Sequence, residues 1–174
     1  MRIATFVVAA TFSLCCAAAP LPASQGETLT GLMNWAIRLS KYPAPDAMPE
    51  VRYVPQQFFD EHACGGHKCT VWGWYPNTGD NVVYVHERVR ALLNDASDPR
   101  GLLAASIVVH EFVHYLQAAS RGFSPYDCKQ ALQLEREAYQ AQSAYLVNYG
   151  RYLPVGVSMH GANCAGSATQ AAVR

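Results

Sequence analysis

The sequence has no excess of charge of either sign and few charged residues overall. Lys and Arg number 13, Asp and Glu also number 13, and together they make up 15% of the 174 residues. Proteins that bind nucleic acid or anionic membrane surfaces usually carry a basic excess, so this balance disfavours both classes. We find no internal repeat and no linker long enough to divide the chain. Since 51% of the residues are apolar, we expect one globular domain over residues 24–174.

The first 19 residues have the composition of a secretory signal peptide. One positive charge at Arg2 precedes an apolar run, and small residues follow that run. Because nothing downstream continues the apolar run, a cleaved signal is favoured over a membrane anchor. We expect cleavage near residues 18–23 and a secreted or periplasmic protein, exported in the bacterial manner, with no membrane span after cleavage. A lipid anchor at Cys15 or Cys16 is disfavoured, because neither follows the usual Leu-small-small triplet.

Four cysteines follow the expected signal peptide: Cys64, Cys69, Cys128 and Cys164. An even number in an exported chain indicates two disulfides, with three possible connectivities. We favour Cys64–Cys69, which closes a short loop, and Cys128–Cys164, which tethers the tail to the start of the last long helix. His62 and His67 lie beside the first pair, so a structural zinc site is the alternative there. A disulfide is the simpler outcome in an oxidising compartment.

The pattern of apolar residues predicts an α+β fold, a minimal domain with a small antiparallel sheet packed on its central helix. Apolar residues at helical spacing predict helices over 27–41, 98–121 and 128–149. Asp98 suits the N-cap of the second helix, Pro99 suits its first position, and Gly122 suits its end. β-Branched and aromatic runs predict strands over 51–54, 70–75 and 81–86, the last two joined as a hairpin by a turn at 76–80. From Pro154 the tail is expected to be irregular.

The segment His110-Glu111-Phe112-Val113-His114 carries the chemistry of the sequence. Residues four apart lie on the same face of a helix, so the two histidines can present ring nitrogens to one zinc ion. Glu111 lies beside them, where its carboxylate could take a proton from a zinc-bound water, as in metal-assisted peptide hydrolysis. The surrounding residues are apolar, so these polar groups need partners or a metal. The alternative is a helix whose His and Glu are merely hydrogen-bonded.

A third metal ligand is expected from the following helix, which contains Glu135 and Glu137. The two point roughly 200° apart, so only one can face the ion. Glu135 falls on the apolar arc of the helix, where a buried carboxylate requires a partner, so we prefer it as the ligand. Glu137 remains the alternative ligand; otherwise it is expected to be solvated or paired with Arg136 or Arg151.

This arrangement resembles the gluzincins, zinc metallopeptidases in which H-E-x-x-H on one helix is followed by a Glu ligand on the next. In gluzincins a small residue commonly stands three positions after the ligand; Ala138 has that spacing from Glu135, whereas Gln140 has it from Glu137. The sequence departs from the family at Tyr139, where an Asp often orients a zinc-bound His. That role could pass to a backbone carbonyl or to Tyr139 itself.

The Cys-x4-Cys segment together with HEFVHYLQ and EREAYQAQ is also similar to small exported bacterial zincin-like proteins, and the resemblance spans about residues 64–149. It implies a donor for the oxyanion of the transition state, often a Tyr or His away from the motif helix. The candidates are His160, Tyr152, Tyr149 and Tyr126. We favour His160 and Tyr152, because the tail could fold over the cleft. It also implies an edge strand that binds extended peptide, for which 82–86 is the candidate.

These features predict an exported, single-domain zinc peptidase that acts on a peptide or protein substrate. His110, His114 and Glu135 would hold Zn²⁺, and Glu111 would act as the general base. The alternative is a zincin-like envelope protein that keeps the metal for binding or structure without catalysis. The short chain favours that alternative, because little of it remains to build specificity pockets. The presence of Glu111 disfavours it, because a structural zinc site needs no general base.

Overall fold

The computed structural model describes residues 28–95, 97–122 and 127–164, which form an α+β fold. The expected signal peptide and Tyr126 lie outside these ranges. The helices are α1 (Leu29–Ser40), α2 (Gln56–Phe58), α3 (Glu87–Asn94), α4 (Gly101–Arg121) and α5 (Cys128–Asn148), with a π-helical turn η1 (Phe59–Ala63) and a 3-10 helix η2 (Val157–His160). The strands are β1 (Glu50–Val54), β2 (Gly73–Trp74) and β3 (Val82–His86).

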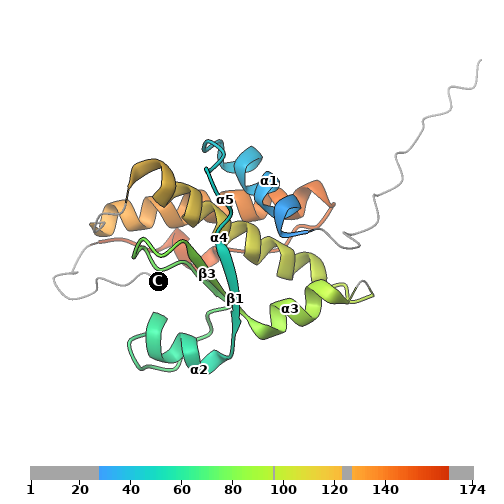
Figure 1. Cartoon of the computed structure of the whole chain (residues 1–174), viewed down its shortest axis with the longest axis horizontal. Helices are drawn as coiled ribbons and strands as arrows, with labels where there is room; N and C mark the ends of the chain where they lie inside the picture. The colour runs from blue at the N-terminus through green and yellow to red at the C-terminus, as the bar shows by residue number, and fades with distance from the viewer. Residues whose placement is uncertain (1–27, 96, 123–126, 165–174) are drawn as a thin grey trace, which may run out of the picture.

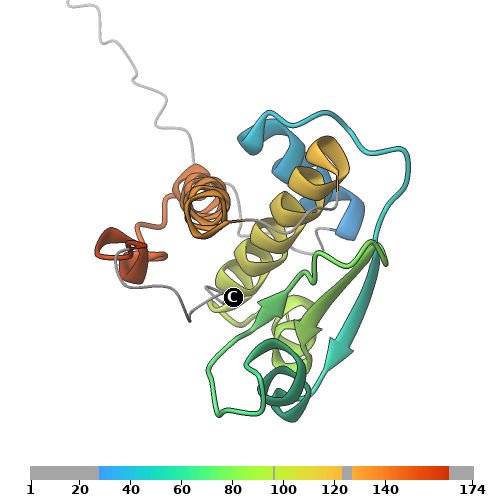
Figure 2. The same cartoon turned by 90° about the vertical axis from the view of Figure 1, so that its left-hand side faces the viewer.

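Helix α4 is the central element of the fold. Figures 1 and 2 show α1, α3 and α5 packed around it, with the sheet on the side away from α5. Of its 21 residues, 14 are buried. By length and composition alone α4 could cross a membrane, but 78% of its most apolar window is buried inside the structure, as in the core helix of a soluble protein. Any side chain in the middle of α4 is therefore held by neighbours on several sides.

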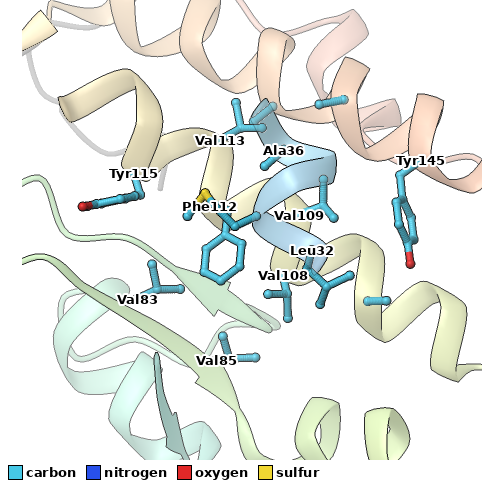
Figure 3. Close-up of a cluster of buried hydrophobic side chains, with 14 of the residues drawn as sticks. Leu32, Ala36, Val83, Val85, Val108, Val109, Phe112, Val113, Tyr115 and Tyr145 are labelled. Carbon is cyan, nitrogen blue, oxygen red and sulfur yellow. The ribbon is translucent and has the colours of Figure 1, made fainter. Parts of the chain in front are cut away.

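The hydrophobic core fills the space between α4, α1 and the sheet. Figure 3 shows Phe112 of α4 between Leu32 of α1 and the strand residues Val83 and Val85. All four are fully buried. Burial of one such side chain stabilises the fold by roughly 1.5–3 kcal/mol. This packing fixes the rotation of α4 about its axis, and hence the directions in which the polar residues of the same helix point.

The sheet is mixed, with strand order β1-β3-β2. The predicted hairpin is confirmed, because β2 pairs antiparallel with β3 through Gly73↔Val85. The prediction of a wholly antiparallel sheet is wrong, because β1 runs parallel to β3. The chain between them includes α2, η1 and β2, which is long enough for the crossover that parallel pairing requires. Strand β3 is central, so the prediction that residues 82–86 form the edge is also wrong; β2 is the edge strand next to β3.

The start of α4 differs from the prediction. The helix begins at Gly101, and the carboxylate of Asp98 instead accepts a hydrogen bond from the backbone of Arg100 at 2.8 Å and pairs with its guanidinium. Asp98 therefore stabilises the turn before the helix. The end at Gly122 is confirmed, with a φ of 77° that a glycine adopts without strain. Helix α5 begins with a capping box in which Asp127 and Gln130 bond to each other's backbone amides.

Both predicted disulfides, Cys64–Cys69 and Cys128–Cys164, are present. The first occupies both thiols of the segment considered as a structural zinc site, which therefore has no thiolate to offer. The second joins the start of α5 to the C-terminal tail. The tail is mostly irregular, as expected, but it includes the short helix η2, which packs against α5.

Candidate metal centre

Helices α4 and α5 bring His110, His114 and Glu135 together. The Nε2 atoms of the two histidines lie 3.1 Å apart. The carboxylate of Glu135 lies 3.5 Å from Nε2 of His110 and 3.4 Å from Nε2 of His114, through different oxygens. All three ligand atoms lie within 4.8 Å of one another, so the group could hold a metal ion. Of the two glutamates considered from the sequence, Glu135 is in the group.

The group lies mostly out of solvent, with side chains of His110, His114 and Glu135 that are 9%, 15% and 17% exposed. Burial lowers the pKa of His110. Burial alone would also lower the pKa of His114, but the carboxylates of Glu135 and Glu111 raise it to about 9. Against burial, the two histidines hold the pKa of Glu135 well below its usual range. The geometry therefore favours a cation between these side chains, either a proton or a metal ion.

Glu111 lies beside the group and is held by strand β2. It is 5% exposed, and burial raises the pKa of its carboxyl to about 8, while a hydrogen bond from the backbone of Tyr75 acts in the opposite direction. A Cβ atom at Gly73 would lie 2.5 Å from Oε1 of Glu111 and 2.6 Å from its Cγ. Only glycine fits at this point of β2. The sequence carried a signal for this contact, since a glycine inside a strand often marks a close approach of other atoms.

Glu137 faces away from the group into a separate polar network. Its carboxylate accepts hydrogen bonds from Tyr42 Oη at 2.7 Å, from Gln117 Nε2 at 3.1 Å and from Gln133 Nε2 at 3.0 Å. The guanidinium of Arg121 lies 3.5 Å from it. The expected pairing with Arg136 or Arg151 is therefore wrong. As a ligand, Glu137 is not supported, because its oxygens are committed to these four partners.

Tyr139 meets the edge of the His110 ring, with ring centroids 4.4 Å apart. The chain of the C-terminal tail crosses Tyr139 at Gly156, where a Cβ atom would lie 2.6 Å from Cγ of the tyrosine ring and φ is +67°. Tyr139 thus joins the candidate metal centre to the tail. The aromatic ring occupies the position at which gluzincins often have an Asp, and it contacts the histidine through its ring.

The candidate oxyanion donors do not gather around the group. Tyr152 is 82% exposed, and His160 is exposed at the end of η2. Among the described residues, no hydrogen bond, ion pair or ring contact joins either one to the three converging side chains. Tyr149 packs against the rings of Trp35 and Tyr145. A donor role for Tyr152 or His160 stays a prediction.

Two buried glutamines that the sequence did not single out lie next to the group. Gln117 Oε1 lies 2.9 Å from Nδ1 of His114. Gln142, on α5, donates a hydrogen bond to the hydroxyl of Ser106 on α4 at 3.1 Å. Their helical spacing from the candidate ligands, three residues after His114 and seven after Glu135, is the signal that would have found them.

Comparison of the chain with protein-family models, with curated proteins and with solved structures found no match.

Proposed function

We propose that this protein is an exported zinc-dependent peptidase of the gluzincin type, with a minimal zincin-like fold. The observation that carries the proposal is the convergence of His110, His114 and Glu135 with Glu111 beside them. Around a tetrahedral zinc ion with bonds of about 2.0–2.2 Å, ligand atoms lie about 3.3–3.6 Å apart. The 3.1 Å between the two Nε2 atoms lies slightly below that range, and the 3.4 and 3.5 Å to Glu135 lie within it but involve different oxygens of the carboxylate.

The donor set also supports zinc and a catalytic centre. Two imidazoles and one carboxylate suit Zn²⁺, whose catalytic sites use three protein ligands, whereas its structural sites use four. The described part of the chain adds no fourth His, Cys, Asp or Glu atom to the group. The four cysteines from residue 64 onward are paired in disulfides. These disulfides are typical of an oxidising compartment, which agrees with export.

When bound, zinc supplies Lewis acidity that activates a water molecule and polarises the scissile carbonyl. Glu111 is the residue that would take a proton from the attacking water and return it to the leaving amine. Its pKa of about 8 without metal reflects burial, and a nearby cation lowers the pKa of a carboxyl group toward the neutral range in which a general base works best. His110, His114 and Glu135 hold the ion, and Gly73 holds the base in place.

Strand β2 is the element that we propose binds the substrate, in place of residues 82–86. It is the last strand of the described sheet on the side away from β1, and its Gly73 touches the proposed base. An extended peptide can add to such an edge through backbone hydrogen bonds, which would align its carbonyls along the metal centre.

The Glu111→Gln substitution tests the mechanism. The variant should bind zinc in the same stoichiometry as the parental protein, because its ligands are intact. Hydrolysis of a peptide library should fall by at least about 10²–10⁴-fold, because the amide cannot accept the proton. Glu61→Gln, at an exposed position, is the matched control and should leave both zinc content and cleavage unchanged. Cleavage by the Glu111→Gln protein at the parental rate would refute the proposed base.

A zincin-like binding or structural protein is the second candidate function. The low exposure of the three candidate ligands favours it, because a closed metal centre stabilises a fold without turnover. Zinc content and peptide-library cleavage measured on the same sample separate the two. One zinc ion per chain with no cleavage of any peptide would favour the binding protein.

A further inference from the structure

The two candidate metal-binding histidines direct the same ring nitrogen toward the metal centre. Nε2 of His110 and Nε2 of His114 both face Glu135. A histidine that binds a metal through Nε2 carries its proton on Nδ1, and the group that accepts that proton fixes the tautomer and the angle of the ring. The partners of the two Nδ1 atoms therefore decide whether the histidines are ready to bind.

Gln117 is the partner of His114, and its amide has only one consistent orientation. Its Nε2 lies 3.0 Å from the backbone carbonyl of Leu134 and 3.1 Å from the carboxylate of Glu137, both of which only accept hydrogen bonds. The nitrogen of the amide must therefore point toward α5, and Oε1 must face His114 at 2.9 Å. An amide oxygen only accepts, so Nδ1 of His114 carries a proton, which leaves Nε2 as the nitrogen that can bind a metal.

Glu137 holds Gln117 in this orientation. Its carboxylate is itself fixed by the hydroxyl of Tyr42 at 2.7 Å and by the guanidinium of Arg121 at 3.5 Å. The hydrogen bonds run from His114 to Gln117 and from Gln117 to Glu137, so a carboxylate acts on the histidine through an amide. Glu137, which the sequence offered as a ligand, lies at the far end of this chain.

Gln142 has the corresponding place beside His110. Its Nε2 donates to the hydroxyl of Ser106, whose proton goes to the backbone carbonyl of Leu103 at 2.7 Å. This leaves Oε1 of Gln142 to accept. His110 follows Ser106 by one helical turn, and its buried Nδ1 has no hydrogen bond of standard geometry. An amide oxygen turned toward this nitrogen would satisfy it.

We propose that Gln117 and Gln142 are positioning residues that hold His114 and His110 as Nδ1–H tautomers, so that two neutral amides replace the carboxylate expected at Tyr139. The inference rests on the proposed zinc site. The difference matters chemically, because a neutral amide polarises the Nδ1–H bond less than a carboxylate does, leaves less electron density on the imidazole and makes the histidine a weaker ligand. The chain would thus hold zinc less tightly than a carboxylate-supported centre.

Zinc affinity of the Gln117→Met and Gln142→Met variants tests this directly. Methionine has a similar shape but cannot accept the proton, so each variant should bind zinc about 10–100-fold more weakly in competition with a chelating dye. Gln140→Met, at an exposed position on α5, the helix of Gln142, is the matched control and should bind zinc as the parental protein does. Binding within twofold of the parental value in both test variants would overturn the inference.

Two further measurements separate positioning from a general loss of structure. In the double variant Gln117→Glu with Glu137→Gln, the carboxylate and the amide exchange places, so His114 keeps an acceptor; zinc affinity should equal or exceed the parental value. Nitrogen-15 NMR of the zinc-loaded protein should show protonated Nδ1 on both histidines, with the His114 signal lost or shifted in Gln117→Met. A double variant as weak as Gln117→Met would overturn the inference. A parental chain that binds no zinc would instead refute the proposed function.

Discussion

The contact between Gly73 and Glu111 predicts a large effect from the addition of a single methyl group. In Gly73→Ala the new Cβ would lie 2.5, 2.6 and 2.8 Å from Oε1, Cγ and Cδ of Glu111. Ordinary contacts between such atoms are about 3.5–4.0 Å, so the carboxylate must move by roughly 1 Å or the strand must shift. Glu111, on the core helix α4, is 5% exposed and has little room to move.

The magnitude follows from this overlap. Extra volume in a packed interior costs about 1–3 kcal/mol of unfolding free energy, and Tm falls by roughly 2–4 °C for each kcal/mol in a domain of this size. Misplacement of a catalytic group by about 1 Å can reduce activity about 10²-fold. The three proposed ligands do not touch Gly73, so zinc stoichiometry should stay at the parental value.

The assay combines thermal unfolding, zinc content and kcat/KM on a peptide that the parental protein cleaves. Gly161→Ala is the control, because a Cβ at Gly161 meets nothing within 4 Å. The double variant Gly73→Ala with Glu111→Ala adds a decisive comparison: truncation of Glu111 removes all three overlapping atoms, so Gly73→Ala should cost less stability in that background than in the parental one. An unchanged Tm in Gly73→Ala would refute the close packing of β2 on Glu111.

Two other properties should respond in a predictable direction. Zinc affinity should rise about tenfold per pH unit as pH increases from about 6.5 to 9, because zinc binding displaces the proton of His114, whose pKa of about 9 lies above its usual 6.5. Competition with a chelator across this pH range measures the affinity. An affinity that does not change with pH would contradict His114 as a ligand. Because the pKa of His114 is higher in the folded metal-free protein than in the unfolded chain, protonation of His114 stabilises the fold fully below pH 6.5. This stabilisation is lost as pH rises through 9, which thermal unfolding at several pH values would show. Removal of the Cys128–Cys164 disulfide, which spans 36 residues, should lower the unfolding free energy by about 4 kcal/mol. Removal of Cys64–Cys69, which spans 5 residues, should lower it by about 2 kcal/mol, because a shorter loop restricts the unfolded chain less. Equal losses of Tm in the two cysteine-to-serine pairs would argue against this loop-entropy account.

Local signals in the sequence accounted for α1, α5, the β2–β3 hairpin and both disulfides. The same local signals did not predict the boundary between β3 and α3, where one residue belongs to both elements. His86 ends β3 and also caps α3, where its Nδ1 accepts the backbone N–H of Arg88. No loop residue separates the two elements, so the sequence gives no sign of the boundary. Asp98 is a residue type typical of a helix N-cap, but its carboxylate binds the backbone N–H and the guanidinium of Arg100 in the turn that precedes α4.

The candidate metal centre was predictable to the extent that it depends on helical spacing. His110 and His114 follow from one helix, and Glu135 follows from the apolar arc of the next. The direction of β1 did not follow, because strand pattern does not specify the pairing partner. The orientation of the two glutamine amides did not follow either, because it depends on acceptors such as Leu134 and Ser106, which only the packing of α4 on α5 brings near.

The placement of the candidate ligands has a consequence for the order in which the chain assembles. His110 and Glu135 lie on neighbouring helices, whereas Gly73 reaches Glu111 only after β2 has joined the sheet and the sheet has docked on α4. Contacts between segments close in sequence form faster than distant ones. We therefore expect the helical hairpin α4–α5 to bring the proposed zinc ligands together before β2 holds the proposed general base in place. The proposed peptidase would then acquire its metal before its proposed hydrolytic activity, and refolding followed by both zinc uptake and cleavage would reveal the delay.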